Sequence, residues 1–405
     1  MAPAIAGDLD RAGVAKYFPE PYYIGERDTA LPVWPLFRHN IPQSDDFLGY
    51  VYESIDLAPI AGYSGTPPNL LIAITPEGTF IAVTVVSHNE PIFKHGVEEA
   101  ALERFANQYR GLSVKQSIKV SATNSSGQSQ SAANVFIDGV ARATVSVRIM
   151  NETVLAASLK VARAKLGLAP GRDPALAPHL KPDDGTTLSA EAVKAKELVA
   201  RTVIDNIDVD KAFGAAFTKD SEGGPRVDPK APSTEVWVSY LSAPQIGRAV
   251  LGKAGFDLLM KEFHEGDHAI LVATRGRYGF QGPGQRPGAV PDQLSITQDG
   301  LPINVSDALA VRPPDSEALP KGLAWTVLKV IAEAGLDPSR PSQLAMRITR
   351  KNGEIYPRLE MREFPISFQA PPAYFSAAEI PLDGWRAVWF EQRYKIALTL
   401  AALLM

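Results

Sequence analysis

The chain has 405 residues, 45% of them hydrophobic, which is enough for two or three globular domains with sizeable cores. Its 41 basic and 45 acidic residues give a net charge of -4, which disfavours charge-driven binding to nucleic acid or an anionic membrane. Cysteine is absent, so the sequence excludes disulfides, thiolate nucleophiles, cysteine-ligated zinc and cysteine-ligated iron–sulfur clusters.

The first predicted elements are a hairpin and a helix. Residues 69–87 contain two β-rich runs on either side of the turn Pro76-Glu77-Gly78, which predicts a β-hairpin. Residues 98–112 are helix formers with apolar side chains near one face, and Gly111 is typical of a helix end. We expect this helix to pack on the sheet that contains the hairpin.

The segment from Asp138 to Ser146 follows a polar loop at residues 121–133 and a short predicted strand at residues 134–137. A predicted helix then continues to about Lys165. Thr144 would therefore lie at a strand-to-helix elbow, where unpaired N–H groups and the helix dipole favour a phosphate. Taken alone, the same threonine would be an ordinary helix cap.

The second half of the chain leans towards β structure. Residues 167–187 are crowded with proline and glycine and predict a linker, and residues 189–207 predict a charged amphipathic helix. A polar loop is expected at 219–233 and a helix at 244–263. Strands are expected at 235–241 and 269–274, with a hairpin of 344–349 and 355–361 about Asn352-Gly353.

Two motifs in this half are candidates for a metal site and for a nucleic-acid-binding tract. Residues 264–268 contain two histidines and two carboxylates, but their order is not that of a helix-borne zinc motif, and Gly266 favours a turn. Residues 275–282 mix arginine, aromatic and glycine residues, and they favour a strand-ending loop over a nucleic-acid-binding tract.

The C-terminal run from Ile396 to Met405 is apolar and is preceded by Trp385, Trp389 and Tyr394, like an interfacial belt. It is about half of the ~20 residues that a membrane span needs. We expect a truncated transmembrane helix here; a short amphipathic or core helix is the alternative. On this expectation the chain is a soluble portion of a membrane protein without its leader and spans.

Three segments together resemble the FMN-binding domain shared by NosR, NirI and the RnfG and NqrC type of electron-transport subunit. In that family the attachment motif reads Asp-x-x-Ser-Gly-Ala-Thr-x-Ser/Thr. Asp138, Ala143, Thr144 and Ser146 match it, whereas Ala141 replaces the serine and Arg142 the glycine. Residues 62–67 resemble the family's Gly-Tyr-x-Gly segment, and residues 88–91 its His-x-Glu-Pro form. Residues 152–155 are similar to a run that distinguishes the NosR-like branch.

The resemblance covers roughly residues 48–166 and implies a cofactor site with FMN attached covalently to Thr144. No metal site is expected. The implied cofactor-binding residues are Asp138, Gly139, Val140, Ala141, Arg142, Ala143, Thr144, Val145 and Ser146, with Gly62, Tyr63, Ser64, Gly65, Thr66, His88 and Glu90.

The predicted fold class is α+β in two domains. An FMN-binding domain with a small central sheet and packed helices is expected at residues 20–166, followed by the linker at 167–187. A second mixed, β-leaning α+β domain of unknown role is expected at 188–392, and the start of the truncated transmembrane helix at 393–405.

The resemblance implies the periplasmic portion of a NosR-like inner-membrane protein, an electron-transfer and regulatory flavoprotein rather than an enzyme. It would support nitrous-oxide reductase activity and expression. The implied partners are a flavin transferase, nitrous-oxide reductase or its accessory proteins, and the membrane through missing spans; this portion would contact no nucleic acid. The alternatives are a ligand-binding or sensing module without redox turnover, and an RnfG/NqrC-type subunit, which the large second domain argues against.

Overall fold

The computed structural model describes residues 7–40, 45–121, 134–168, 178–214, 232–280, 293–308, 317–352 and 358–376, together with residue 392. Helices and sheets are mixed in both halves of the chain, so the predicted α+β class is confirmed. Residues 122–133 of the loop predicted at 121–133, most of the polar loop at 219–233 and the apolar C-terminal run lie outside the described residues, as do 169–177 of the linker.

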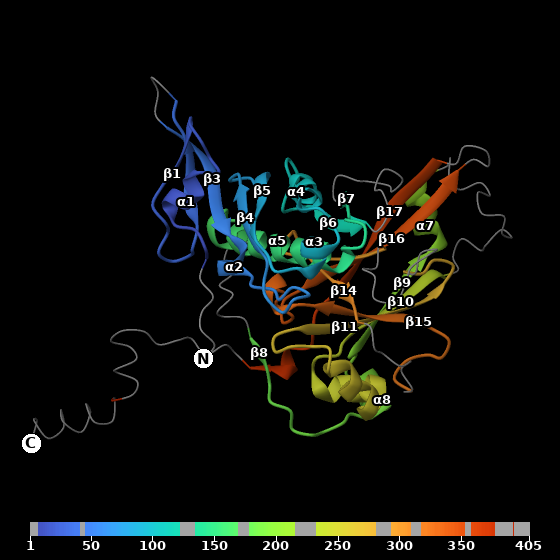
Figure 1. Ribbon diagram of the computed structural model, residues 1–405. Coiled ribbons are helices and arrows are strands. Elements are labelled where there is room, and N and C mark those ends of the chain that lie inside the picture. The colour runs from blue at the N-terminus through green and yellow to red at the C-terminus, as the bar shows by residue number, and fades with distance from the viewer. Residues whose placement is uncertain are drawn as a thin grey trace, which may run out of the picture.

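A five-stranded antiparallel sheet forms the first domain, with its strands in chain order (Figure 1). The predicted hairpin is confirmed as its last two strands, which pair from Asn69 with Ser87 to Ile74 with Phe80. The strands are β1 (Tyr22–Ile24), β2 (Trp34–Arg38), β3 (Asp46–Glu53), β4 (Asn69–Ile74) and β5 (Phe80–Ser87).

Helices cover both faces of this sheet. The short helix α1 (Arg11–Ala15) closes a small core on one face, around Trp34 and Val51. The larger core on the other face lies beneath α2 (Ser54–Leu57), α4 (Glu99–Asn107) and α5 (Thr144–Lys165). The packing of α4 on the sheet confirms the expectation, although α4 ends at Asn107, before the predicted Leu112. The residues beyond it turn back through Gly111, whose φ is +81° and whose amide donates to the Phe80 carbonyl.

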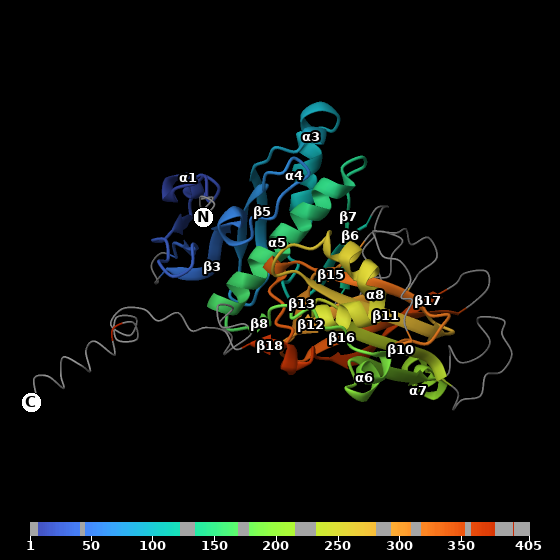
Figure 2. The same ribbon diagram turned by 90° about the horizontal axis from the view of Figure 1, so that it is seen from below.

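Helix α5 spans the 22 residues that the sequence predicts, and fourteen of them are buried. A helix on the surface of a domain buries one stripe, so burial around the helix requires cover on more than one side. The first sheet covers one side of α5, and the second half of the chain covers another (Figure 2).

Two sheets and helix α8 (Pro244–Met260) share one core in the second domain. The predicted strands, the helix and the pairing of the long hairpin are confirmed, although the second strand of the hairpin begins at Arg358 and Gly353 of its predicted turn lies outside the described residues. Helix α8 is interrupted at Gly252, where φ is +72°. One sheet has the order β14 (Ser306–Asp307), β15 (Ala324–Val330), β11 (His268–Gly276), β10 (Pro232–Tyr240) and β9 (Val199–Asp205). The other has the order β13 (Leu301–Ile303), β12 (Leu294–Gln298), β16 (Ser342–Asn352) and β17 (Arg358–Phe368).

The single helix predicted at 189–207 is wrong. The chain forms α6 (Ala190–Ala195), then strand β9, then α7 (Asn206–Phe213). Glu197 adopts a φ of +51°, which ends the first helix. The β-branched residues of Val199–Asp205 then pair along the edge of β10, because they fit a pleated strand better than a helix.

Part of the predicted linker is ordered against the second domain. Strand β8 (His179–Leu180) pairs with β18 (Phe375–Ser376), which follows the 3-10 turn Pro372–Tyr374. A few residues later, Asp183 accepts two hydrogen bonds from the guanidinium of Arg248, at 2.6 and 2.7 Å. The segment therefore links β18 to α8.

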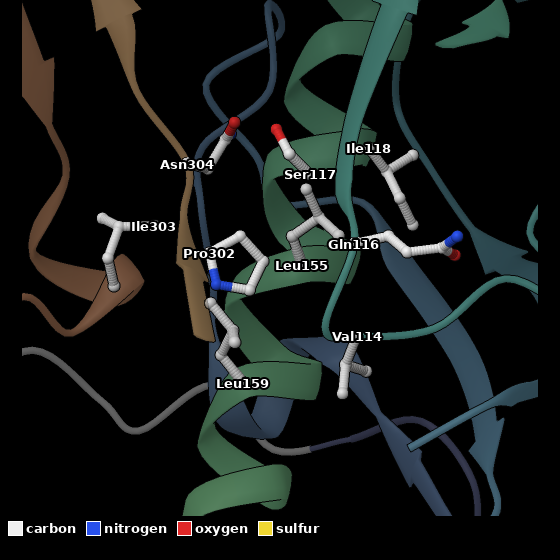
Figure 3. A pocket seen from close by; sticks show the side chains of 9 residues that line it. All are labelled: Val114, Gln116, Ser117, Ile118, Leu155, Leu159, Pro302, Ile303 and Asn304. Carbon is white, nitrogen blue, oxygen red and sulfur yellow. The ribbon is translucent and has the colours of Figure 1, made fainter. Parts of the chain in front are cut away.

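The two domains meet along α5 and its neighbours. Lys119 donates to the Leu294 carbonyl at 2.9 Å, and Arg163 donates to the Ala334 carbonyl, in the 3-10 turn Ala332–Ala334, at 3.2 Å. A cavity of about 10 Å³ remains at this junction beside Leu159 and Pro302 (Figure 3). It has room for about one water molecule, so it is a packing defect rather than a ligand site.

Within the ranges described above, none of the helices combines the length and the apolar character needed to cross a bilayer.

Candidate functional site

The elbow that carries Thr144 begins at a pair of parallel strands. Strand β7 (Asn134–Asp138) pairs with β6 (Ser117–Ser121), so both strands end at the same edge. The side-chain amide of Gln108 donates to the Asp138 carbonyl at 2.9 Å and accepts from the Asp138 amide at 2.7 Å. The Gly139 amide then donates to the Ser121 carbonyl at 3.0 Å, which fixes the chain as it leaves the strand.

A tight turn leads from the strand into α5. The Ala143 amide donates to the Val140 carbonyl at 3.0 Å, and Arg142 takes the left-handed conformation with a φ of +68°. Helix α5 then begins at Thr144, and the N-cap is Ala143, which supplies no side-chain cap. Thr144 is therefore not the helix cap; it is the first helical residue and is exposed to solvent.

A pocket of about 520 Å³ lies in front of this helix start. Its size falls within the ~300–1,000 Å³ of typical small-molecule sites. Its walls come from the start of α5, from the turn before it, and from two segments of the first half of the chain. The lining residues are Tyr63, Pro91, Ile92, Arg142, Ala143, Thr144, Val145 and Ser146.

Six of the residues predicted for the site line this pocket, and Pro91 and Ile92 are additional. Both belong to the first turn of α3 (Pro91–His95); Pro91 is the last residue of the predicted His-x-Glu-Pro segment, and Ile92 follows it directly. Proline at the start of a helix was the available signal for them. Their position shows that the starts of α3 and α5 face the same pocket.

The loop of residues 62–66 is closed by two backbone hydrogen bonds. The Gly62 amide donates to the Thr66 carbonyl and the Gly65 amide to the Gly62 carbonyl, both at 3.0 Å. This loop presents Tyr63 at the pocket with 74% of its surface exposed. Ser64 and Thr66 bond to each other through their hydroxyls at 2.8 Å rather than lining the pocket.

His88 and Glu90 lie outside the pocket lining. Glu90 is 1% exposed, and His88 packs its ring edge-on against Phe93 and accepts from the Glu90 amide at 3.3 Å. Asp138, Gly139, Val140 and Ala141 are likewise absent from the lining and form the elbow that leads to it. The three predicted segments are thus brought together, with only part of each facing the pocket.

The pocket favours a negatively charged ligand group at the start of α5. The first amides of an α-helix have no carbonyl partner within the helix, and the helix dipole places partial positive charge there. Arg142 adds an exposed guanidinium to the same wall. Tyr63, Ile92 and Val145 supply apolar surface, so the arrangement suits a ligand with a flat apolar part and a phosphate.

The two motifs of the second half belong to ordinary structural elements. Residues 264–268 form the predicted turn, in which Gly266 has a φ of +87° and Asp267 pairs with Lys329 at 3.1 Å. Among the described residues, no three potential ligands are grouped to hold a metal. Arg275, at the end of β11, forms an ion pair with Glu235 at 2.6 Å.

On the interface side of α5, a partly buried acid, Glu152, lies two turns beyond the pocket. Burial raises the pKa of Glu152, and the nearby charges of Arg148 and Lys329 oppose that rise. Lys329 belongs to β15, so the body of the helix that begins at the pocket faces charged groups of the second domain.

Comparison with known proteins finds relatives along most of the chain. The chain is 26% identical over 416 residues to the regulatory protein NosR of Pseudomonas aeruginosa; the match covers 98% of this chain and 56% of that protein. NosR of Stutzerimonas stutzeri is 26% identical over 90% of the chain and 51% of its own length. Protein NirI of Paracoccus denitrificans is 25% identical over 95% and 52%. The chain spans about half the length of these relatives. No protein-family model matches it.

Proposed function

Since the chain belongs to the NosR/NirI family, we propose that it is a regulatory flavoprotein portion of a NosR-like membrane protein, with FMN held in the pocket before α5. The observation that carries the proposal is the position of Thr144. Thr144 is exposed as the first residue of a 22-residue helix and lines a pocket of about 520 Å³.

The residues present fit a flavin phosphate. The amides at the start of α5 and the guanidinium of Arg142 would surround the phosphate oxygens. Tyr63 and Val145 would lie against the apolar ring system. When bound, FMN would supply one-electron or two-electron redox chemistry, and the chain would orient it and exclude water from part of it.

The attachment that we propose is a phosphoester made by a separate flavin transferase. The Thr144 hydroxyl oxygen bonds to the FMN phosphorus of FAD and loses its proton. The pyrophosphate P–O bond breaks, and adenosine monophosphate leaves. A covalent link keeps the cofactor on the protein at low free flavin concentration, because occupancy then no longer depends on mass action.

The protein would act as an electron carrier and regulator rather than as an enzyme, in the periplasm and anchored in the inner membrane by segments of the longer protein. We propose nitrous-oxide reductase or its accessory proteins as its partners. The relatives carry the names of regulatory proteins, which supports a regulatory role in denitrification.

Intact mass spectrometry tests the proposal on the full chain produced together with a flavin transferase. The wild type and Thr144→Ser should carry an FMN-phosphoryl increment, and Thr144→Ala should lack it. Thr297→Ala, which removes a threonine of β12 in the second domain, is the control and should keep the increment. An increment that survives Thr144→Ala overturns the site.

A wild type without any increment favours the second candidate, a sensing module that binds its ligand without an ester. Arg142 is the observation behind this candidate, because it replaces a glycine of the attachment motif and lines the pocket two residues before Thr144. Binding of free FMN followed by flavin fluorescence, with Arg142→Ala as the weakened variant, tests that alternative.

A further inference from the structure

Glu90 is a buried residue next to the segments that line the pocket. It is the N-cap residue of α3, directly before Pro91, and is 1% exposed. Its carboxyl group reaches two other segments of the chain. One carboxyl oxygen accepts a hydrogen bond from the Ser146 hydroxyl in the first turn of α5. The other lies 3.5 Å from the Ser64 amide in the loop of residues 62–66.

The hydroxyl group of Ser146 is therefore used in its hydrogen bond to Glu90. Its hydroxyl donates its single proton to the carboxyl group, and the residue is 5% exposed. A phosphate at the start of α5 would therefore meet backbone amides and Arg142 rather than this hydroxyl. Ser146 connects the helix start to the segment that carries Glu90.

Gly62 allows the same carboxyl group to reach the loop. A Cβ atom on Gly62 would lie 2.2 Å from Oε1 of Glu90 and 2.9 Å from the Thr66 carbonyl oxygen. Gly62 is not in the left-handed region, so the requirement for glycine here is space and not backbone conformation. In contrast, Gly65 has a φ of +81° and no atom within 4 Å of its Cβ position.

A buried carboxyl group without hydrogen-bond donors is costly, so Glu90 constrains the groups that supply its bonds. The loop of Tyr63, the start of α3 and the start of α5 each provide one wall of the pocket. They come from three separate parts of the sequence; Glu90 belongs to the start of α3 and contacts the other two. Shortening this side chain would leave each wall free to move independently.

We propose that Glu90 is the positioning residue of this site: it joins Ser146 to the Ser64 amide in the loop of residues 62–66 and so sets the distance between Tyr63 and Thr144 without touching the ligand. Two measurements test this role. The first, the rate of FMN loading, rests on the proposed flavin function; the second, amide hydrogen exchange, does not.

The first readout is the rate at which the full chain is loaded with FMN by the transferase, followed by intact mass. Glu90→Ala, Gly62→Ala and Ser146→Ala should each slow loading on the order of tenfold or more, since misplacement by about 1 Å has effects of that size. Glu90→Gln keeps an acceptor for Ser146 and should recover part of the loss.

Tyr52→Phe is the matched control. It removes another buried hydrogen bond to α5, from the Tyr52 hydroxyl to Ser158 at 2.8 Å, far along the helix from the pocket. It should lower the thermal midpoint as much as Ser146→Ala does and leave the loading rate unchanged. Equal loading rates in Tyr52→Phe and Ser146→Ala overturn the positioning role.

The second readout needs no flavin and so separates failure of this inference from failure of the proposed function. Amide hydrogen exchange should rise together in residues 62–66 and 143–147 of Glu90→Ala and Gly62→Ala, and in neither segment of Tyr52→Phe. Exchange that rises in only one segment, or in both segments of Tyr52→Phe, contradicts the proposal even if the wild type never binds FMN.

Discussion

The carboxylate of Asp28 lies 2.5 Å from the ammonium of Lys165, the last residue of α5 and the residue farthest along that helix from Thr144. Asp28 also accepts from the amides of Ala30 and Leu31, at 2.9 and 3.0 Å. Lys165 first, and then these two amides, lower the pKa of Asp28 from 3.8 to about 2. The end of the helix is therefore tied to the segment before β2 by an ionised side chain.

This interaction predicts a pH dependence of stability. Because the pKa is lowered in the folded state, Asp28 contributes stability that is complete above pH ~4 and is lost as the pH falls through about 2. Asp28→Asn should therefore have a lower free energy of unfolding than the wild type at pH 7, and the gap should shrink towards pH 2. Urea titrations at pH 7, 4 and 2.5 measure it; a gap that does not change with pH contradicts the prediction.

Arg142→Gly should stabilise the protein and weaken ligand binding. A side chain in the left-handed region costs ~1–2 kcal/mol, and Arg142 has a φ of +68°. Glycine should raise the free energy of unfolding by about 1 kcal/mol, which chemical denaturation measures. If the guanidinium contacts the phosphate, flavin occupancy should fall in the same variant.

Ala141→Gly is the control for this substitution. Ala141 is exposed and adjacent, and its φ is not positive, so glycine there only adds freedom to the unfolded chain. Its free energy of unfolding should decrease by roughly 0.4–1 kcal/mol. Similar effects of the two substitutions would show that the conformation of Arg142 costs nothing.

Leu159→Ala should destabilise both domains together. Leu159 is 2% exposed on α5 and packs with Leu301 of β13 in a small cluster at the domain junction. Truncation of a buried leucine typically costs ~2–5 kcal/mol. We expect a lower thermal midpoint and a smaller additional loss when Leu301→Ala is combined with it, because the two side chains share their contacts. Fully additive losses would mean that the two leucines act independently.

The pKa of Asp183 should rise when Arg248 is removed. The two hydrogen bonds from Arg248, followed by the Gly185 amide, lower this pKa to about 2. In Arg248→Ala it should move up towards its ordinary value of 3.8, as NMR titration of the carboxyl carbon would report. Gln245→Ala removes a bond to the neighbouring Asp184 and should leave Asp183 unchanged. An unshifted Asp183 in Arg248→Ala would exclude the arginine as the cause.

Much of the fold could be predicted from local pattern. The hairpin of β4 and β5 and the helix from Thr144 to Lys165 follow from β-branched runs, a turn and a long stretch of helix formers. The parallel pairing of β6 with β7 could not, because such a pairing joins segments that are distant in sequence. The short elements between Ala190 and Phe213 were missed because charged residues at helical spacing obscured the alternation of edge strand β9.

The candidate site was predictable in its segments but not in the role of each residue. Residue order placed Thr144 at a helix start, which the structure confirms. Burial of Glu90 and exposure of Tyr63 depend on how three segments pack, and the sequence carries no local signal for that. The left-handed conformation of Arg142 was not predicted either. The only signal for it was the glycine at this position of the family motif, because glycine adopts that conformation readily.

The placement of α5 between the two domains has a practical consequence for dissecting this chain. A fragment that stops at the end of α5 would contain the whole pocket, but it would also uncover Leu159 and leave Lys119 and Arg163 without the carbonyls of Leu294 and Ala334. Such a fragment would expose the apolar surface around Leu159 together with the charged groups of Lys119 and Arg163, and it would tend to aggregate. The smallest piece suited to ligand-binding work therefore includes the second domain, even though none of the residues described for that domain lines the pocket.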